Sequence, residues 1–195
     1  SSSMPQEGKT TVAINIAISM AMSGERVLIV DTDMRRPRVH KAFGLTAKQG
    51  ISSVLVNEAK LEDVTQKSPV DNLWVLPCGS TPPNPAELLH TKRFRELVEE
   101  LKGKYDRVIF DSPPVGAVTD PVILSKAVDG AILVAKTGVT IRAMLAKTAR
   151  VFSDVKANVL GCVLNDMDPN RRTYGGYYHY YYYRKRGYYQ YYGDS

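Results

Sequence analysis

Residues 3–10 have the types and spacing of a loop that binds phosphate. The segment reads Ser-Met-Pro-Gln-Glu-Gly-Lys-Thr and ends in Gly8, Lys9 and Thr10. In such a loop the glycine lets the backbone approach a phosphate, the lysine reaches the β- and γ-phosphates, and the threonine hydroxyl can ligate Mg²⁺. The following helix would point its N-terminus at the anion. The segment predicts a nucleotide-binding P-loop, against the alternative of a chance Gly-Lys-Thr at a helix start.

Two features depart from the usual P-loop. Ser3 occupies the position of the usual first glycine, and only two residues precede it, whereas a P-loop normally follows a β-strand. We therefore expect that the first strand before the P-loop is missing from this sequence, which would be an N-terminally truncated piece of a longer chain.

A pair of aspartates follows an apolar run further along the chain. Residues 27–30 are Val-Leu-Ile-Val, and Asp31 and Asp33 come directly after them. Alternate residues of an extended chain share one side, so both carboxylates would lie together at the strand end where ligands bind in α/β sheets. Carboxylates beside a nucleotide can hold Mg²⁺ or its waters and can accept a proton from a hydroxyl. The alternative is a solvated aspartate pair in a loop.

A second apolar strand also ends in aspartate. Residues 108–110 are Val-Ile-Phe and lead into Asp111, the form of a Walker B element whose carboxylate supports Mg²⁺. Many strands end in aspartate, so this feature alone is weak. Because it follows the P-loop and the aspartate pair in the expected order, the three together predict a nucleotide site.

The elements that must position these residues alternate along the chain. Short apolar runs predict buried strands at residues 27–30, 73–76, 108–110, 131–135 and 159–164. Helical patterns lie at residues 10–23, 37–43, 51–55, 86–90, 91–102, 121–127 and 140–153. The Thr140 hydroxyl is expected to cap the last of these helices. Such alternation predicts an α/β fold, with a parallel sheet flanked by helices.

Composition limits the class of protein. Of 195 residues, 44% are hydrophobic and 24% are charged, which is typical of a chain that folds around a core. No stretch reaches the about 18 uninterrupted apolar residues that a membrane helix needs, and no signal peptide opens the sequence. Two cysteines, Cys78 and Cys162, both in apolar surroundings, exclude a disulfide-built fold and indicate a reducing, cytoplasmic setting.

The C-terminal segment differs from the rest of the chain. It holds eleven of the twelve tyrosines: Tyr174, Tyr177, Tyr178, Tyr180, Tyr181, Tyr182, Tyr183, Tyr188, Tyr189, Tyr191 and Tyr192. Residues 171–195 contain five Arg or Lys and one Asp, a balance of +4 within the net charge of +6. Because the segment has no aliphatic residue, we predict a domain at 1–168 and a disordered, basic tail at 169–195. Because the net charge of the domain without the tail is near zero, we expect no nucleic-acid partner.

The combination resembles the bacterial tyrosine kinases (BY-kinases) over nearly the whole chain. The resemblance is carried by the Ser-Ser-x-Pro-x-Glu-Gly-Lys-Thr opening, by Asp-Thr-Asp-Met-Arg-Arg-Pro at 31–37, by residues 79–89, by Asp-Ser-Pro-Pro at 111–114 and by the tyrosine-rich end. It implies a P-loop fold related to the MinD and ParA ATPases. It also implies ATP with Mg²⁺ as phosphate donor and the eleven C-terminal tyrosines as acceptors.

The resemblance maps the family's functional residues onto this chain. Its Walker lysine and hydroxyl correspond to Lys9 and Thr10, its second-motif aspartates to Asp31 and Asp33, and its Walker B aspartate to Asp111. Thr10 is expected to ligate Mg²⁺ directly and Asp111 through a water, with Asp31 or Asp33 as further support. Asp31 is the candidate for accepting the tyrosine proton, although the spacing does not decide between the two aspartates. The expected ATP-binding residues are Glu7, Gly8, Lys9, Thr10 and Thr11, with Asn165 as an adenine contact or a turn-forming residue.

The resemblance also implies a biological setting. BY-kinases are cytoplasmic autokinases of capsular and exopolysaccharide polymerisation and export, which places the chain at the inner face of the cell membrane. The expected partners are further copies of the chain in a ring that phosphorylate one another, and a tyrosine phosphatase. A further expected partner is a membrane polysaccharide co-polymerase region, either fused upstream or acting as a separate activator.

Several alternatives stay open. A MinD- or ParA-like partition or scaffold ATPase would carry a second lysine early in the loop, and none precedes Lys9. Arg35 or Arg36 could contact phosphate or a neighbouring subunit, or remain a solvated loop charge. The interleaved Arg and Tyr of the tail could instead stack on single-stranded nucleic acid or sugars, or have no function.

Overall fold

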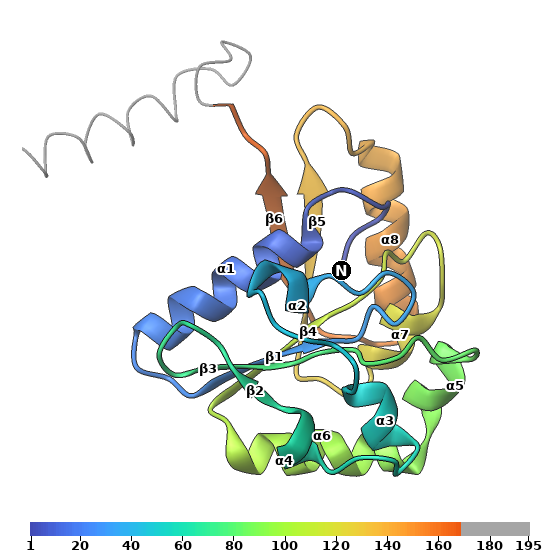
Figure 1. Cartoon of the computed structure of the whole chain (residues 1–195). Helices are drawn as coiled ribbons and strands as arrows, with labels where there is room; N and C mark the ends of the chain where they lie inside the picture. Colours follow the sequence, from blue (N-terminus) through green and yellow to red (C-terminus); the bar gives the residue numbers. More distant parts are fainter. Residues whose placement is uncertain (169–195) are drawn as a thin grey trace, which may run out of the picture. The chain divides into compact units, whose positions relative to one another are not determined.

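The fold is an α/β domain in which strands and helices alternate along the chain (Figure 1). The computed structural model describes residues 1–168, and its compact unit comprises Ser1–Asn165. The strands are β1 (Val27–Asp31), β2 (Gln66–Lys67), β3 (Leu73–Leu76), β4 (Arg107–Asp111), β5 (Ala131–Lys136) and β6 (Val159–Asn165). The helices are α1 (Lys9–Met22), α2 (Val39–Ala42), α3 (Ile51–Leu55), α4 (Leu61–Val64), α5 (Pro85–His90), α6 (Lys92–Lys104), α7 (Asp120–Leu124) and α8 (Arg142–Asp154).

The strands form two hydrogen-bonded groups. The first has the order β2-β3-β1-β4, with β1 parallel to both β3 and β4, and the second is the parallel pair β5-β6. The register of β1 with β4 places Asp31 opposite Asp111. All five predicted strands are present, and the α/β class is confirmed. The short antiparallel strand β2 escapes sequence reasoning, because Gln66 and Lys67 form neither an apolar run nor an alternating pattern.

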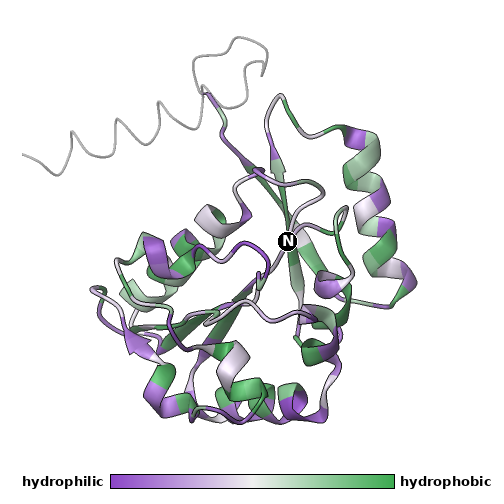
Figure 2. Ribbon diagram, turned by 45° about the vertical axis from the view of Figure 1, so that its right-hand side comes forward, coloured by the Kyte–Doolittle hydropathy of each residue, from purple (hydrophilic) through white to green (hydrophobic). Residues whose placement is uncertain are grey.

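Side chains of β1 pack into cores on both faces of the sheet. Val27 and Ile29 pack on the side of α1, whereas Leu28 and Val30 pack on the side of α3, α4, α5 and α6. All four are fully buried, and each contributes about 1.5–3 kcal/mol by leaving water. Burial on both faces is the reason why the strand is a continuous apolar run. Figure 2 shows hydrophobic residues along β1, and hydrophilic residues on many of the outer turns of the helices.

The helices follow the predicted pattern except for α4 and the start of α8. The helix α4 was not predicted, because its four residues are too few to show a helical period. Helix α8 begins at Arg142, and no side chain caps it. The Thr140 hydroxyl instead accepts a hydrogen bond from Lys136 N at 2.7 Å and donates one to the carboxylate of Glu7. The predicted cap is therefore wrong, because Thr140 lies too early in the chain and its hydroxyl is already engaged. None of the helices described is long and apolar enough to span a bilayer.

The two cysteines have different surroundings. Both are free thiols; Cys78 is buried, and Cys162 is exposed on β6. Burial, reinforced by the charges of Asp31 and Asp33, raises the pKa of Cys78 to about 12, so its thiol stays protonated. The expected apolar surroundings are confirmed for Cys78 and wrong for Cys162, because β6 pairs on one side only and several of its residues remain exposed.

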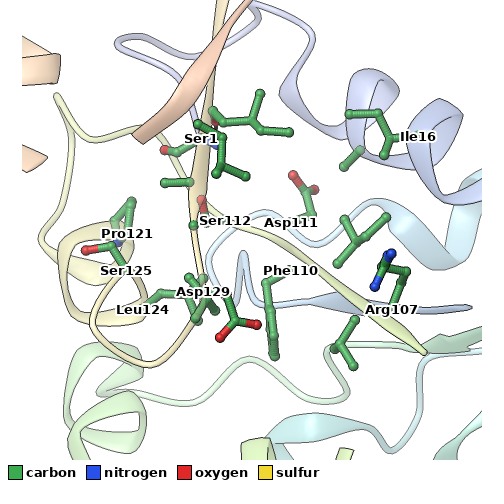
Figure 3. A pocket seen from close by; sticks show the side chains of 18 of the residues that line it. Ser1, Ile16, Arg107, Phe110, Asp111, Ser112, Pro121, Leu124, Ser125 and Asp129 are labelled. Atoms are coloured by element: carbon green, nitrogen blue, oxygen red, sulfur yellow. Dashed lines mark hydrogen bonds between the residues drawn. The ribbon is translucent and has the colours of Figure 1, made fainter. Parts of the chain in front are cut away.

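The sheet is interrupted between β4 and β5. Within residues 1–168 no ladder joins these two strands, and a cavity of about 500 Å³ lies between them, lined by residues such as Ile16, Phe110 and Leu124 (Figure 3). At one end of the gap Ser2 forms a parallel bridge with Val134.

Candidate active site

The phosphate-binding segment is a tight loop that leads directly into α1. Gly8 has a φ of 89° in the left-handed region, and its carbonyl accepts the hydrogen bond from Val12 N that opens the helix. A Cβ at Gly8 would lie 2.0 Å from Nδ2 of Asn165, so the close approach of β6 also demands glycine here. Because α1 has no acidic residue in its first turn, the positive end of the helix is available to an anion.

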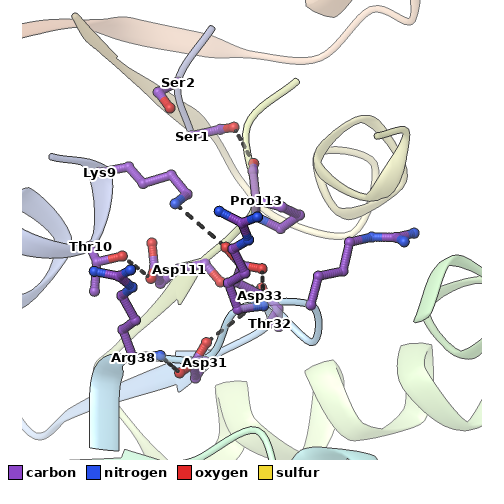
Figure 4. A network of polar contacts seen from close by, with 12 residues as sticks. Ser1, Ser2, Lys9, Thr10, Asp31, Thr32, Asp33, Arg38, Asp111 and Pro113 are labelled. Atoms are coloured by element: carbon purple, nitrogen blue, oxygen red, sulfur yellow. Dashed lines mark hydrogen bonds and ion pairs between the residues drawn. The ribbon is translucent and has the colours of Figure 1, made fainter. Parts of the chain in front are cut away.

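Side chains from α1, β4 and the loop after β1 meet beside this segment (Figure 4). Thr10 Oγ1 donates to Asp111 Oδ2 at 2.6 Å, and Lys9 Nζ lies 3.5 Å from Asp33 Oδ2. The β1–β4 register explains the convergence, because it sets Asp31 beside Asp111 at the same end of the sheet. The structure thus brings together the five residues that the three motifs single out.

Asp31 is the most enclosed of these residues. It is fully buried, and its Oδ2 accepts from the amides of Arg38 and Val39 at 2.9 and 3.0 Å, at the start of α2. Burial raises the pKa of Asp31 to about 7; the amide hydrogen bonds oppose this rise, and the charges of Asp111 and Asp33 add to it. Asp31 therefore anchors the loop after β1 and is also a carboxyl group that can exchange a proton near neutral pH.

The oxygens of Thr10 and Asp111 fit a magnesium ion. Burial raises the pKa of Asp111, and the hydrogen bond from Thr10 and the charge of Lys9 oppose this rise. Both side chains present hard oxygen donors of the kind that Mg²⁺ prefers. Among residues 1–168, no group of three or more His, Cys, Asp or Glu is placed to hold a metal by itself. A magnesium ion here would therefore take most of its ligands from phosphate and water.

The other predicted ATP-binding residues surround the loop. Glu7 is 1% exposed, and its carboxylate accepts from Met4 N at 2.8 Å and from the Thr140 hydroxyl. Asn165, at the end of β6, donates from Nδ2 to the Glu7 carbonyl at 3.1 Å. Thr11 is exposed in the first turn of α1. Both oxygens of the Glu7 carboxylate are thus engaged by groups of the protein.

One ion pair near the site is not predicted from the sequence. Arg35 donates from Nε and Nη2 to the two carboxylate oxygens of Asp120 at 3.1 and 3.3 Å, and Asp120 is 1% exposed at the start of α7. The pair ties the loop after β1 to α7. The sequence marks Asp120 only as part of an Asp-Pro dipeptide at a helix start, and this pattern does not indicate that Arg35 is its partner. Arg36 is exposed.

The eleven candidate acceptor tyrosines lie outside the described residues. Tyr105 is the twelfth tyrosine, and it follows α6. Its ring lies 5.6 Å from that of Trp74, at a tilt of 59°. The side chain is partly buried, so Tyr105 differs from an exposed acceptor.

Comparison with known proteins identifies the family. The sequence model of the AAA domain matches residues 7–156. The chain is 41% identical over 176 residues to the tyrosine-protein kinase YwqD of Bacillus subtilis, a match that covers 90% of this chain and 74% of that protein. Among solved structures, the kinase domain of the Escherichia coli tyrosine kinase ETK is similar with a TM-score of 0.85 at 32% identity, over 91% of this chain and 69% of that one. The septum site-determining protein MinD of Pyrococcus horikoshii, complexed with Mg-ADP, is similar with a TM-score of 0.72 at 27% identity, over 86% and 69% of the two chains. Sequence and fold together show that this chain belongs to the bacterial tyrosine-protein kinases.

Proposed function

We propose that this kinase transfers the γ-phosphate of ATP to the tyrosines of its own C-terminal tail, residues 174–192. The observation that carries the proposal is the convergence of Lys9, Thr10, Asp33 and Asp111 beside a helix N-terminus. Phosphoryl transfer depends mainly on holding the phosphates in line and neutralising their charge, and these side chains are of the types that do so.

Each loop residue has a proposed task. The Lys9 ammonium, which contacts Asp33 in this structure, would bind the β- and γ-phosphates, and the amides around Gly8 would cradle them. Thr10 would hold Mg²⁺ directly and Asp111 through a water; the ion would neutralise charge on the phosphates. Similarity to a MinD complexed with Mg-ADP supports nucleotide and Mg²⁺ as ligands, and tyrosine-kinase relatives support ATP.

The proton acceptor is proposed from the aspartate pair. Asp31 has a pKa near 7, which suits proton transfer at neutral pH, but it is fully buried. The loop after β1 would have to open before a tyrosine hydroxyl reached it. Asp33 is 5% exposed and faces Lys9, so we assign it to support of the base, the metal or the lysine. Asp31→Asn should therefore lower kcat and also remove its pH dependence near 7, whereas Asp33→Asn should lower kcat and keep that dependence.

The basic tail suggests how phosphorylation would change assembly. Each phosphate adds about −1.5 to −2 charge at neutral pH, so about three would reverse the +4 balance of residues 171–195. We propose that the unmodified tail docks on a neighbouring copy of the chain in a ring and that the phosphorylated tail leaves it. Native mass spectrometry should then show smaller assemblies after phosphorylation, and equal assembly masses would contradict this switch.

The wider setting is proposed from the family. We propose a role in capsule or exopolysaccharide polymerisation and export at the inner face of the cell membrane, as the family resemblance implies. A membrane co-polymerase region, fused or separate, would activate the kinase, and a tyrosine phosphatase would reset it. The near-neutral charge of residues 1–170, 21 basic against 19 acidic, is the reason for proposing no nucleic-acid partner.

The decisive experiment is incubation with Mg-ATP followed by phosphopeptide mapping. Phosphotyrosine should appear in the peptide that spans residues 174–192 and be absent from Tyr105, which serves as an internal control. Lys9→Met should abolish it, whereas Lys48→Met, an exposed lysine in the loop after α2, should not. An unmodified tail in wild-type protein that binds Mg-ATP in the presence of the activating co-polymerase region would overturn the proposal.

A second candidate function is that of a partition or scaffold ATPase. The likeness to MinD, at 27% identity and a TM-score of 0.72, favours it as the alternative. Steady ATP hydrolysis with an unmodified tail would support this alternative, and Lys9→Met would abolish the hydrolysis as well. The absence of a second lysine before Lys9 is the sequence feature against it.

A further inference from the structure

The buried carboxylate of Glu7 performs a task that the kinase motifs do not describe. Both of its oxygens are used within the protein: one accepts from Met4 N at 2.8 Å, and the other accepts from the Thr140 hydroxyl. A carboxylate aimed at a nucleotide would repel the phosphates. At 1% exposure, the side chain is instead enclosed between the loop and the segment that joins β5 to α8.

The loop around Glu7 needs such support because its backbone is strained. Gln6 has a φ of 64° and Gly8 a φ of 89°, so the left-handed region is used on both sides of Glu7. The left-handed conformation costs a residue such as glutamine about 1–2 kcal/mol, and it persists only where the surroundings hold it. The bond from Met4 N to Glu7 closes the loop upon itself, but this bond alone does not fix the loop to the sheet.

Thr140 supplies a connection to the sheet through the Glu7 side chain, in addition to the bond from Asn165 Nδ2 to the Glu7 carbonyl. Its hydroxyl oxygen accepts from Lys136 N, in the last residue of β5, at 2.7 Å. With its oxygen held there, the hydroxyl donates its proton to Glu7. A chain of hydrogen bonds thus runs from β5 through Thr140 and Glu7 to Met4, across the strained part of the loop.

We propose that Glu7 is a positioning residue for the phosphate-binding loop and that Thr140 is the side chain that orients it. Neither is expected to touch substrate; together they hold the amides of the loop in the shape that receives the β-phosphate. The proposal deepens the kinase function and rests on it only in that the bound anion is taken to be a nucleotide phosphate.

The test uses substitutions at Thr140 with a matched control. Thr140→Val keeps the shape of the side chain and removes both hydrogen bonds, and Thr140→Ser restores the hydroxyl. Thr65→Val is the control, because Thr65 directly follows α4 and its hydroxyl donates to the carbonyl of Leu61, the first residue of that helix. The measurements are the Kd for fluorescent Mg-ADP, amide hydrogen exchange across residues 4–8 without nucleotide, and the melting temperature.

Thr140→Val should weaken Mg-ADP binding about tenfold, the effect of losing one hydrogen bond to a charged group. It should also speed exchange across residues 4–8, while Thr140→Ser stays within about twofold of wild type and Thr65→Val binds like wild type. If Thr140→Val does not fold, Glu7→Gln serves instead: its amide replaces one acceptor oxygen by a donor, so binding should weaken in the same way. In steady-state kinetics of either variant, KM for ATP should rise by a larger factor than kcat falls.

Two results would overturn the proposal: unchanged binding and exchange in Thr140→Val, or an equal loss in Thr140→Ser. Phosphotyrosine in the wild-type protein tests the kinase function independently of the positioning role. Weaker Mg-ADP binding in Thr140→Val, together with no phosphotyrosine in wild type, would overturn the autokinase proposal and support the positioning role of Glu7 and Thr140. Phosphotyrosine in wild type, together with an unchanged Kd for Mg-ADP in Thr140→Val, would overturn only the positioning role. If wild type does not bind Mg-ADP, unchanged exchange across residues 4–8 overturns the proposal and faster exchange supports it.

Discussion

Replacing Gly8 by alanine separates two reasons for glycine in the phosphate-binding loop. The first is conformational, because a φ of 89° costs an L-residue about 1–2 kcal/mol. The second is a collision, because the new Cβ would lie 2.0 Å from Nδ2 and 3.1 Å from Cγ of Asn165. Asn165 must then turn away and give up its hydrogen bond to the Glu7 carbonyl, a loss of about 1 kcal/mol.

These two terms make the expected energies non-additive. Gly8→Ala should lower the free energy of unfolding by about 2–3 kcal/mol, and Asn165→Ala by about 1 kcal/mol. In the double variant the hydrogen bond is lost only once and the collision is gone, so it should also lie about 2–3 kcal/mol below wild type. The coupling energy between the two sites is therefore about 1 kcal/mol, above the scatter of about 0.3–0.5 kcal/mol for independent sites.

Urea unfolding followed by circular dichroism gives the four free energies of this cycle. The variants should keep a single cooperative transition, so that the energies can be compared. A double variant destabilised by the full sum of the single effects would refute the collision. A Gly8→Ala variant as stable as wild type would refute both terms.

Three further predictions concern stability. Leu97→Ala in the fully buried face of α6 should cost about 2–5 kcal/mol in urea unfolding, whereas Met22→Ala, at 79% exposure, should cost less than about 0.5 kcal/mol; equal effects would contradict the described core. Thr91→Ala should cost about 1 kcal/mol, because Oγ1 caps α6 by accepting from Phe94 N at 3.1 Å, and Thr91→Ser should restore most of it in the same assay. In metal-free protein, burial raises the pKa of Asp31 from 3.8 to about 7, so its contribution is intact below pH 4 and is lost as pH rises toward 7. Relative to Asp31→Asn, wild type should therefore lose about 4 kcal/mol of unfolding free energy between pH 4 and 8, and parallel pH profiles of the two proteins would contradict the raised pKa.

Much of the candidate site could be read from local patterns. Gly8, Lys9 and Thr10 form a contiguous motif, and Asp31 and Asp111 each end an apolar run. In a parallel sheet such ends lie at one edge, so their convergence follows from the strand pattern alone. The structure agrees, with Thr10 bonded to Asp111 at 2.6 Å.

Other contacts join residues far apart in the chain and leave no local signal. Asp120 and Arg35 are 85 residues apart, and Thr140 and Glu7 are 133 residues apart. A threonine before a helical pattern most often caps that helix, so the sequence predicted a cap on α8 for Thr140 and not its hydrogen bond to Glu7. Its hydroxyl could be assigned only when the end of β5 was seen beside the loop.

By itself the sequence determined the fold class, the family and the residues of the three nucleotide motifs. These depend on periodicity and short spacings, which are properties of neighbouring residues. Only the tertiary structure decided what the carboxylates contact: Asp31 the amides that start α2, Asp33 the lysine, and Glu7 the segment before α8. The physical reason is that a buried carboxylate must find its partners among whatever groups packing brings within about 3 Å, and packing depends on the whole chain.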